Sequence, residues 1–500
     1  MKKMNLLAMS LVSAAALSFS SCSSNDDLGG GAGTQSQVKG FYMTLAVQTP
    51  TSNGTRTSIE NPIPTEDATA VEAAVKTGTF YLVDSKGTVV FSKTLTAQDW
   101  SGAVKDQADS KKDGKTTLQI QVENVAAGAT YKVYFKAGST AMDGVTEPLA
   151  AGATGIFTAT GIEKTFTAAA AFDKTCAGDN NFSMFNQNDE TTKGNGYTVQ
   201  FTDENKVAAN PAKVKYNNAE SAIKIERVTA RVDVPTSATK LTTEELPSTA
   251  SQALKNAVAD AKKKVDKIEL VSYALSNVTN KTYVMQTWID KNLTIPEGVT
   301  LSQPKTAFGT KYLLDATCFK PYATATNDYI FENNKTGEEA TAMYFQYKVT
   351  LKTSEFEGKA DFEDGTFYRY NNVIYTSFAQ IYKAYADVAG LFGGNTAEQM
   401  KTAAITASAT EADLAAFREK YQIEVFKGGM TYYKQVITDK QLGKDVIQRN
   451  TIYRLNVNKI FNVGAQVPNG EIDKNGLFYL DVTVTVNPWV LNTQNVSLGD

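Results

Sequence analysis

The chain of 500 residues contains no histidine and only three cysteines. Without an imidazole there is no Ser-His-Asp triad, no Cys-His pair and no HExxH zinc site. An excess of positive charge is also missing, because 50 Lys and Arg face 53 Asp and Glu. Nucleic-acid binding needs a clustered basic surface. We therefore expect no nucleic-acid partner, no metal and no cofactor.

The remaining candidates for catalysis or ligand binding are weak. The carboxylates of 361–364 and 338–339 could form an acid–base pair, but such clusters are usually solvated turns. The aromatic segments 367–370 and 432–433 could stack against sugars, but aromatic residues in such patterns are more often core or cross-strand pairs. The sequence therefore predicts a protein that is not an enzyme.

The first residues are predicted to direct export. Lys2 and Lys3 precede an apolar run over 6–19, and Ser20, Ser21 and Cys22 follow. This is the pattern of a signal peptide over 1–21. Residues 19–22 resemble the lipobox of bacterial lipoproteins, although Phe19 replaces the usual leucine. The resemblance implies that Cys22 carries two or three acyl chains, enough for a stable anchor at about 0.8 kcal/mol per buried CH₂. The alternative is a plain signal peptide with an incidental cysteine.

No later segment holds 18 consecutive apolar residues, so the sequence predicts no membrane-spanning helix. Cys176 and Cys318 are far apart and belong to no CxxC motif. They either pair in the exported protein or remain two isolated buried thiols.

The body of the chain is predicted to be mainly β. Short segments alternate apolar and polar residues with period two, at 41–47, 79–84, 88–93, 117–123, 130–136, 181–186, 197–202, 222–234, 265–275, 281–286, 342–352, 429–437 and 452–460. Helices are predicted only at 66–76, 249–264, 376–388 and 397–421. We expect antiparallel β-sandwiches with a few short helices. The boundary is placed after Pro235, which gives two domains, 57–235 and 236–500.

The first strand is followed by an accessible linker. Phe41, Met43, Leu45 and Val47 share one face of the strand. The linker 48–58 is polar and rich in turn formers, as expected of a proteolytic site. It contains Arg56, the only arginine before residue 227.

The last strand has the same alternating pattern. Within 477–486 the apolar positions are Phe478, Leu480, Val482, Val484 and Val486. Pro488 cannot donate a ladder hydrogen bond, and Trp489 begins a second apolar segment. From periodicity alone, this segment is better interpreted as a strand of its own domain.

Four segments and the lipoprotein start together resemble the fimbrillin family, which builds type V pili in Bacteroidales, and its Mfa-type major subunit in particular. The segments are 225–232 (IERVTARV), 426–433 (FKGGMTYY), 446–457 (VIQRNTIYRLNV) and 481–489 (DVTVTVNPW). The resemblance implies two transthyretin-like β-sandwiches in a lipidated precursor.

The resemblance also implies a mechanism. An arginine-specific protease cuts Arg56–Thr57, which removes the tether (22–56) and the strand with Phe41, Met43, Leu45 and Val47. The tail, about 477–500, then donates Phe478, Leu480, Val482, Val484, Val486 and Trp489 to the groove of the next copy. Donor and acceptor lie at opposite ends, so the contact builds an open filament.

The predicted function is that of a fimbrial shaft subunit that supports adhesion, with an outer-membrane precursor and a mature form in extracellular fimbriae. Its partners would be copies of itself, tip and anchor subunits and the protease. The alternatives are a tip or anchor subunit, or a non-polymerising surface lipoprotein that binds glycans.

Overall fold

A computed structural model describes part of the chain. The described residues are 40–48, 66–67, 72, 75–101, 104–105, 115–168, 176–178, 182–189, 192–290, 292–302, 305–308, 311–314, 319–356, 358, 360–386, 388, 405, 408–439, 442–466 and 480–490. All of them belong to one compact unit, Gly40–Asp500.

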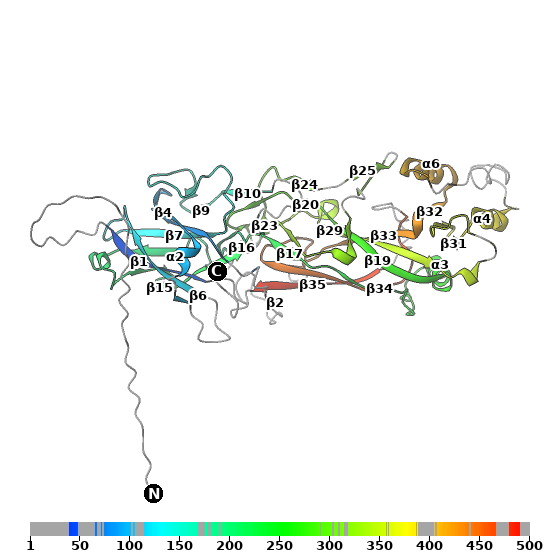
Figure 1. The fold of residues 1–500 in the computed structure, drawn as a ribbon, viewed down its shortest axis with the longest axis horizontal. Helices are drawn as coiled ribbons and strands as arrows, with labels where there is room; N and C mark the ends of the chain where they lie inside the picture. Colours follow the sequence, from blue (N-terminus) through cyan, green and yellow to red (C-terminus); the bar gives the residue numbers. More distant parts are fainter. Residues whose placement is uncertain are drawn as a thin grey trace, which may run out of the picture. The chain divides into compact units, whose positions relative to one another are not determined.

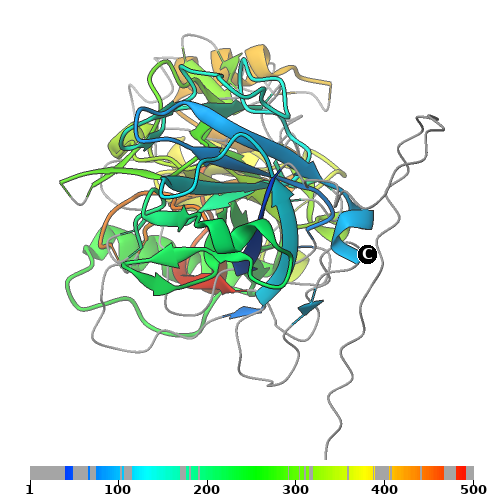
Figure 2. The same ribbon diagram turned by 90° about the vertical axis from the view of Figure 1, so that its left-hand side faces the viewer.

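The largest sheet is built around the first strand, β1 (Phe41–Gln48), which is dark blue in Figures 1 and 2. Its main path runs β15 (Ala219–Glu220), β14 (Lys215–Tyr216), β12 (Tyr197–Gln200), β7 (Thr130–Ala137), β11 (Met184–Asn186), β16 (Ile223–Arg227), β1, β6 (Lys115–Val122) and β5 (Val104–Lys105). Three further strands join it: β13 (Ala212–Lys213) on β1, β3 (Gly78–Val83) on β7, and β4 (Val89–Leu95) on β3. The short helix α2 (Ala97–Ser101) follows β4.

Strand β3 is buried on both faces, as are most residues of its neighbour β7. Phe80 and Leu82 belong to the hydrophobic core that also contains β1. Tyr81 and Val83, on the opposite face, pack into a second cluster with Phe157. The alternation of side chains along a strand produces this division, because both faces are covered by apolar neighbours.

Two further sheets enclose one core and form a β-sandwich. One sheet runs β2 (Glu66–Asp67), β35 (Leu480–Val490), β34 (Thr451–Ile460), β17 (Ala230–Val232) and β28 (Asp328–Ile330), with β18 (Thr236–Ser237) also on β34. The other runs β27 (Lys320–Pro321), β19 (Val265–Ser276), β29 (Ala342–Leu351) and β33 (Met430–Val436). Residues of both sheets, among them Val232, Phe345 and Leu455, make up the shared core.

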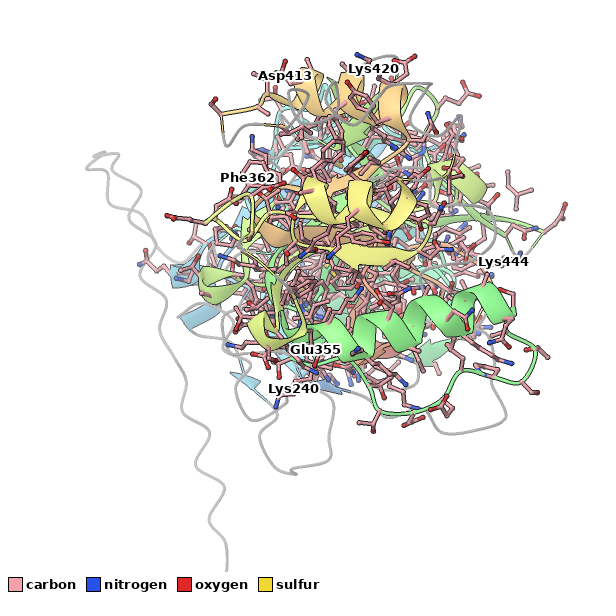
Figure 3. The ribbon with its side chains drawn as sticks, turned by 90° about the vertical axis from the view of Figure 1, so that its right-hand side faces the viewer. Lys240, Glu355, Phe362, Asp413, Lys420 and Lys444 are labelled. Atoms are coloured by element: carbon pink, nitrogen blue, oxygen red, sulfur yellow. The ribbon has the colours of Figure 1, made fainter. Side chains whose placement is uncertain are left out.

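A long insertion joins the neighbouring antiparallel strands β29 and β33. It contains a three-stranded sheet, β31 (Val373–Tyr375), β30 (Phe367–Tyr370) and β32 (Glu424–Phe426), and the helices α4 (Phe378–Tyr385) and α6 (Glu411–Tyr421). Its own core includes Tyr368, Phe378 and Phe417. Figure 3 shows this insertion with Asp413 and Lys420 on α6.

Helix α3 (Gln252–Lys264) covers a separate small cluster of apolar residues and is the green helix of Figure 3. The hydroxyl of Ser251 caps its N-terminus by accepting from the backbone N–H of Leu254 at 3.2 Å. Leu254, Ala257, Val258 and Ala261 form its buried face, and three lysines end its last turn, where cations complement the helix dipole.

The remaining elements are two-stranded ladders and single 3-10 turns. The ladders are β8 (Phe157–Thr158) with β9 (Gly161–Ile162), β10 (Thr165–Thr167) with β21 (Lys281–Tyr283), β20 (Val278–Thr279) with β24 (Leu301–Ser302), β22 (Thr287–Ile289) with β23 (Asn292–Thr294), and β25 (Lys305–Phe308) with β26 (Lys311–Leu314). The turns are η1 (Asp203–Lys206), η3 (Tyr322–Thr324), η4 (Gly337–Glu339), η5 (Thr353–Glu355) and η7 (Lys427–Gly429).

The structure confirms a mainly β fold in several sheets with few short helices. Two local predictions were wrong. The predicted helix 66–76 begins instead with a strand, because Glu66 and Asp67 pair with Trp489 and Val490. The predicted strand 222–234 is two strands in different sheets, since the chain crosses between them at 228–229. In the described part of the chain, no helix is long and apolar enough to cross a membrane.

Candidate functional site

Strand β1 lies inside its sheet, with neighbours on both edges. All eight of its residues pair antiparallel with β6, from Phe41 opposite Val122 to Gln48 opposite Lys115. On the other edge it runs parallel to β13 at Met43 and Thr44, and parallel to β16 at Val47 and Gln48. A strand from the extreme N-terminal side of the fold therefore completes a sheet made by later segments (Figure 2).

The face of β1 predicted to be apolar is the buried one. Met43, Leu45 and Val47 are 0% exposed and Phe41 is 9% exposed. The Phe41 ring packs edge-on against Phe201 at 5.5 Å between centroids. The ammonium of Lys206 lies 5.6 Å from the centre of the Phe41 ring on the solvent side.

This burial gives β1 a large stabilising role. At about 1.5–3 kcal/mol for each buried large side chain, the four contribute on the order of 6–12 kcal/mol before ordering costs. Without β1, an apolar groove would open between β6 on one side and β13 and β16 on the other. Their edge N–H and C=O groups would lose their partners, which is the condition for binding another strand.

The C-terminal strand β35 lies in the second sheet of the same chain. It runs antiparallel to β34, with Leu480, Val482, Val484 and Val486 opposite Ile460, Val457, Leu455 and Tyr453. All four of these β34 residues are buried. The two strands appear side by side in orange to red in Figure 1.

The outer edge of β35 has little cover. Among the described residues, its only neighbour there is β2, which pairs with Trp489 and Val490. Pro488, opposite Thr451, is the last residue of β35 that pairs with β34, and the strand continues to Val490 along β2. Its missing N–H is tolerated because strands at or near a sheet edge accept proline.

Other predicted site residues lie outside the described part of the chain. These are Cys22, Arg56, Thr57 and Phe478. Their predicted roles, like the domain limits 57–235 and 236–500, remain predictions. Cys176 is buried, and Cys318 also lies outside the described residues.

Two of the segments that resemble fimbrillins, 225–232 and 446–457, meet around Glu72. The Glu72 carboxylate accepts from Nη1 of Arg231 at 3.1 and 3.0 Å and from the Tyr329 hydroxyl at 2.7 Å. The Glu72 carbonyl accepts from Nε and Nη2 of Arg227. Arg227 also donates to Oδ1 of Asn450 at 3.1 Å. The groups are buried, so each charge depends on these partners.

Asp233 extends this network at its edge. Its carboxylate accepts from Nε of Arg231 at 2.6 Å and from Nη2 of Arg454 at 2.6 Å. Arg454 lies on β34, directly opposite Thr485 of β35. The network therefore joins β17 to the strand on which the C-terminal strand rests.

A second buried network centres on Arg449. Its Nη2 donates to Glu332 Oε2 at 2.7 Å, and both side chains are almost fully buried. Glu226 lies nearby and is 0% exposed. Burial raises the pKa of the Glu226 carboxyl well above its usual range, and the attraction of Arg449 only partly opposes this.

Arg369 is held within the insertion. Its Nε and Nη2 donate to the two carboxylate oxygens of Glu424, and its Nη1 donates to the Val463 carbonyl at 2.9 Å. The guanidinium also lies 5.0 Å from the centre of the Phe426 ring. Such bidentate pairing fixes the side chain in one orientation.

The weaker candidate sites have structural roles in the described residues. Asp361 accepts from the backbone N–H of Phe378 at the start of α4, at 2.7 Å. Asp364 accepts from the N–H of Thr366 in a turn, at 2.9 Å. The described residues contain no group of three or more Cys, Asp or Glu suited to a metal ion.

The aromatic segments do not form an exposed platform. Phe367 and Tyr368 are 0% exposed, Tyr370 is 8% exposed and Tyr433 is 4% exposed. Tyr432 is half-buried and packs against Phe319 with 5.7 Å between ring centroids. Most of these rings are therefore part of the packed interior.

The C-terminal part of the chain matches a known family. Residues 424–495 match the model of the major fimbrial subunit protein type IV, fimbrillin, C-terminal. Over these residues the chain is similar to the C-terminal region of fimbrillins. This region contains β32, β33, β34 and β35, and it confirms the resemblance drawn from the sequence.

More distant structural likenesses extend over most of the chain. A Parabacteroides distasonis protein assigned to cell adhesion has 12% identity and a TM-score of 0.44, over 90% of this chain and 98% of that one. A second structure with the same assignment and organism has 13% identity and a TM-score of 0.41, over 91% and 98%. A fimbrial assembly protein of the same organism has 10% identity and a TM-score of 0.29, over 63% and 82%. At these scores none supports an argument about this chain, and no curated protein sequence matches it.

Sequence patterns located the fimbrillin region and β1 but missed the role of Glu72. A single glutamate in a segment predicted to be helical gives no sign of a buried partner. The only available signal was the presence of arginines in otherwise apolar strands at 225–232. Buried arginines require carboxylates from elsewhere in the chain.

Proposed function

We propose that this chain is the shaft subunit of a surface fimbria. It would be exported as a lipoprotein precursor anchored through Cys22, cut at Arg56–Thr57, and polymerised by strand exchange. The tail, about 477–500, would then fill the groove that β1 leaves in the next copy. Tip and anchor subunits would be its other partners, and the mature protein would lie in extracellular fimbriae that support adhesion.

The position of β1 is the observation that carries this proposal. An N-terminal strand that is paired on both edges and buried on one face makes its own replacement site when removed. Strand addition uses the same backbone bonds and the same alternating pockets. The fimbrillin C-terminal region, with the strand β35 near a sheet edge, supplies a segment of matching pattern.

The arrangement of the other arginines supports cleavage at Arg56. Arg227, Arg231, Arg369 and Arg449 are at most 5% exposed. Arg454 lies in the paired strand β34, and Arg418 lies within α6. A protease binds an exposed extended segment, so folded strands and helices resist it. Arg56 stands alone in a linker whose composition predicts accessibility.

The glycan-binding alternative loses support, because most of its aromatic residues are buried. The tip-subunit alternative is disfavoured by the donor-like tail. An anchor subunit would have to retain β1, which the isolated Arg56 disfavours.

The proposal is tested with purified precursor and an arginine-specific protease. Sequencing should find a new N-terminus at Thr57, and a mild detergent gel should show a ladder of polymers. Arg56→Ala should remain monomeric, whereas the matched variant Arg418→Ala should behave as the unsubstituted chain. A subunit truncated after Pro468 should be cut but not polymerise. Polymerisation of the truncated subunit would disprove the role of the tail.

A further inference from the structure

The two ends of the chain carry similar strand sequences. Residues 41–47 read FYMTLAV and residues 478–484 read FYLDVTV, with Phe, Tyr and Val at the same first, second and last positions. The internal apolar positions exchange Met43 for Leu480 and Leu45 for Val482. Both substitutions keep an aliphatic side chain of similar size, which cores tolerate best.

We propose that residues 478–484 of one subunit take the register of β1 in the next subunit, with Phe478 in the place of Phe41. This inference rests on the proposed function and adds the pairing of individual residues between the two subunits. The inserted strand would run antiparallel to β6 and parallel to β13 and β16, as β1 does. The competing register, shifted by two residues, would put Leu480 in the place of Phe41.

The position of Phe41 favours the first register. Its neighbour Phe201 is fully buried and also lies 6.1 Å from the Tyr131 ring, so the position is lined by aromatic rings. Edge-on ring pairs contribute about 0.5–1.5 kcal/mol beyond the area they bury. Lys206 adds a cation–π contact that an aliphatic residue would lose. Phe478 restores both interactions and Leu480 restores neither.

The charge of Asp481 favours the same register. It would take the place of Thr44, whose register partner on β13 is Lys213. Lys213 is exposed and pairs with Glu220 at 2.8 Å, so Asp481 would place a second carboxylate beside the same ammonium. An opposite-charge pair on neighbouring strands is favourable. In the shifted register Asp481 would take the place of Tyr42, opposite Gln121.

Disulfide cross-linking between two kinds of subunit distinguishes the registers. Thr44 faces Gln119 on β6, so Asp481→Cys should face Gln119→Cys of the acceptor. Directly opposite residues have Cα atoms about 4.5–5.5 Å apart, within the disulfide range of about 4.4–6.8 Å. The matched control is Gln121→Cys, which would then be a diagonal neighbour at about 7–8 Å. Gln119 and Gln121 are both exposed on β6, so neither substitution alters the core.

The experiment uses full-length precursors in a Cys318→Ser background. One precursor carries Asp481→Cys, and a second carries Gln119→Cys or Gln121→Cys. The two are mixed, cut with the arginine-specific protease and oxidised, so that a bridge reports only contact between copies. The Gln119 mixture should give at least about tenfold more bridged dimer than the Gln121 mixture. Preferential bridging of Gln121, or polymers bridged by neither, would overturn the register.

Failure of the proposed function has a different result. Strand exchange, and the register with it, would be refuted if all precursors were cut at Thr57 but formed no polymers. This includes the precursor that carries only Cys318→Ser. If only the cysteine variants fail to polymerise, assembly kinetics decide instead. Asp481→Lys should slow assembly about two- to fivefold, and adding Lys213→Asp should restore it. No restoration would overturn the register.

Discussion

The strands at the two ends of the chain have similar sequences but different surroundings. β1 is paired along one full edge with β6 and at four positions with β13 and β16 on the other. β35 is paired along β34, and its outer edge meets only the two residues of β2 among the described residues. A strand at the edge can peel away one pair at a time, whereas an internal strand must break both edges. The internal strand therefore needs a cut to leave, and the edge strand does not.

The same residues of β35 cannot pair with β34 and fill the groove of another copy. In this chain they lie on β34, while β1 pairs with β6, β13 and β16. In the proposed function, both ends of a subunit are thus satisfied within one chain before cleavage. Polymerisation in this scheme exchanges one set of backbone bonds for another, and the removal of β1 drives it.

The largest effect is expected where the segment that carries β2 is anchored. Glu72→Ala would remove the buried carboxylate that pairs with Arg231, whereas the backbone carbonyl that accepts from Arg227 remains. Breaking one partner of a buried ion pair costs about 3–5 kcal/mol. Chemical unfolding should show this loss, and hydrogen exchange at Trp489 and Val490 should accelerate because β2 loses its anchor.

The control for this variant is Asp203→Ala, which removes an exposed pair with Lys206. Its effect should stay within about 1 kcal/mol, as for most surface ion pairs. If Glu72→Ala changes stability as little as this control, the anchor is not a stabilising feature.

The second effect separates the two strands directly. Leu45→Ala removes a side chain that is 0% exposed and should destabilise the precursor by about 2–5 kcal/mol. It should leave the filament unchanged, because β1 is gone. Val482→Ala, at the corresponding position of the tail, should instead lower the temperature at which the filament dissociates. Thermal melting of the precursor and the filament of each variant tests whether each substitution destabilises a different form. Equal destabilisation of precursor and filament by Leu45→Ala would contradict the prediction.

The smallest effect concerns Glu226, which lies on β16, a strand that pairs directly with β1. Burial raises its pKa in the folded chain, so the folded state holds a proton that the unfolded state releases above about pH 4.3. Stability from this group is therefore full at low pH and falls as the pH rises towards the folded pKa. Glu226→Gln should leave the free energy of unfolding unchanged near pH 4 and increase it at pH 7. This increase should be smaller than the losses expected for Glu72→Ala and Leu45→Ala.

Unfolding curves at the two pH values measure this difference. Glu204→Gln, at an exposed position, serves as the matched control and should change little at either pH. A loss of stability in Glu226→Gln at pH 7 would show that the buried carboxyl is ionised and needed.

Periodicity predicted the β-rich class and most strand positions. The alternation of apolar and polar residues indicates which face of a strand is buried, whichever strand lies beside it. The prediction of one strand over 222–234 missed the break between β16 and β17. The apolar positions change phase at Glu226 and Arg227, two consecutive charged residues. Just beyond them, Val228 and Thr229 carry the chain from one sheet to another. The carbonyl of Thr229 accepts from the N–H of Asn450 at this crossing, a partner more than two hundred residues away.

The beginning of the helix predicted at 66–76 was wrong for a similar reason, although Glu72 is helical. Its composition favours helix, but Glu66 and Asp67 gain ladder bonds from β35 at the far end of the chain. The sequence around Glu72 likewise gives no sign that this residue is buried. Its role depends on hydrogen bonds from Arg227 and Arg231, which lie far along the chain. Tertiary contacts outweigh a propensity of a few tenths of a kcal/mol per residue.

By itself, the sequence determined the absence of imidazole chemistry, the apolar faces of the two end strands, the lone Arg56 and the fimbrillin C-terminal region. These are properties of residue type and order, which need no partner. Only the tertiary structure decided that β1 lies inside its sheet and β35 near an edge, and that Arg231, Arg369 and Arg449 are buried against carboxylates. Such neighbours come from distant segments, and backbone pairing and charge burial depend on the partner as much as on the residue.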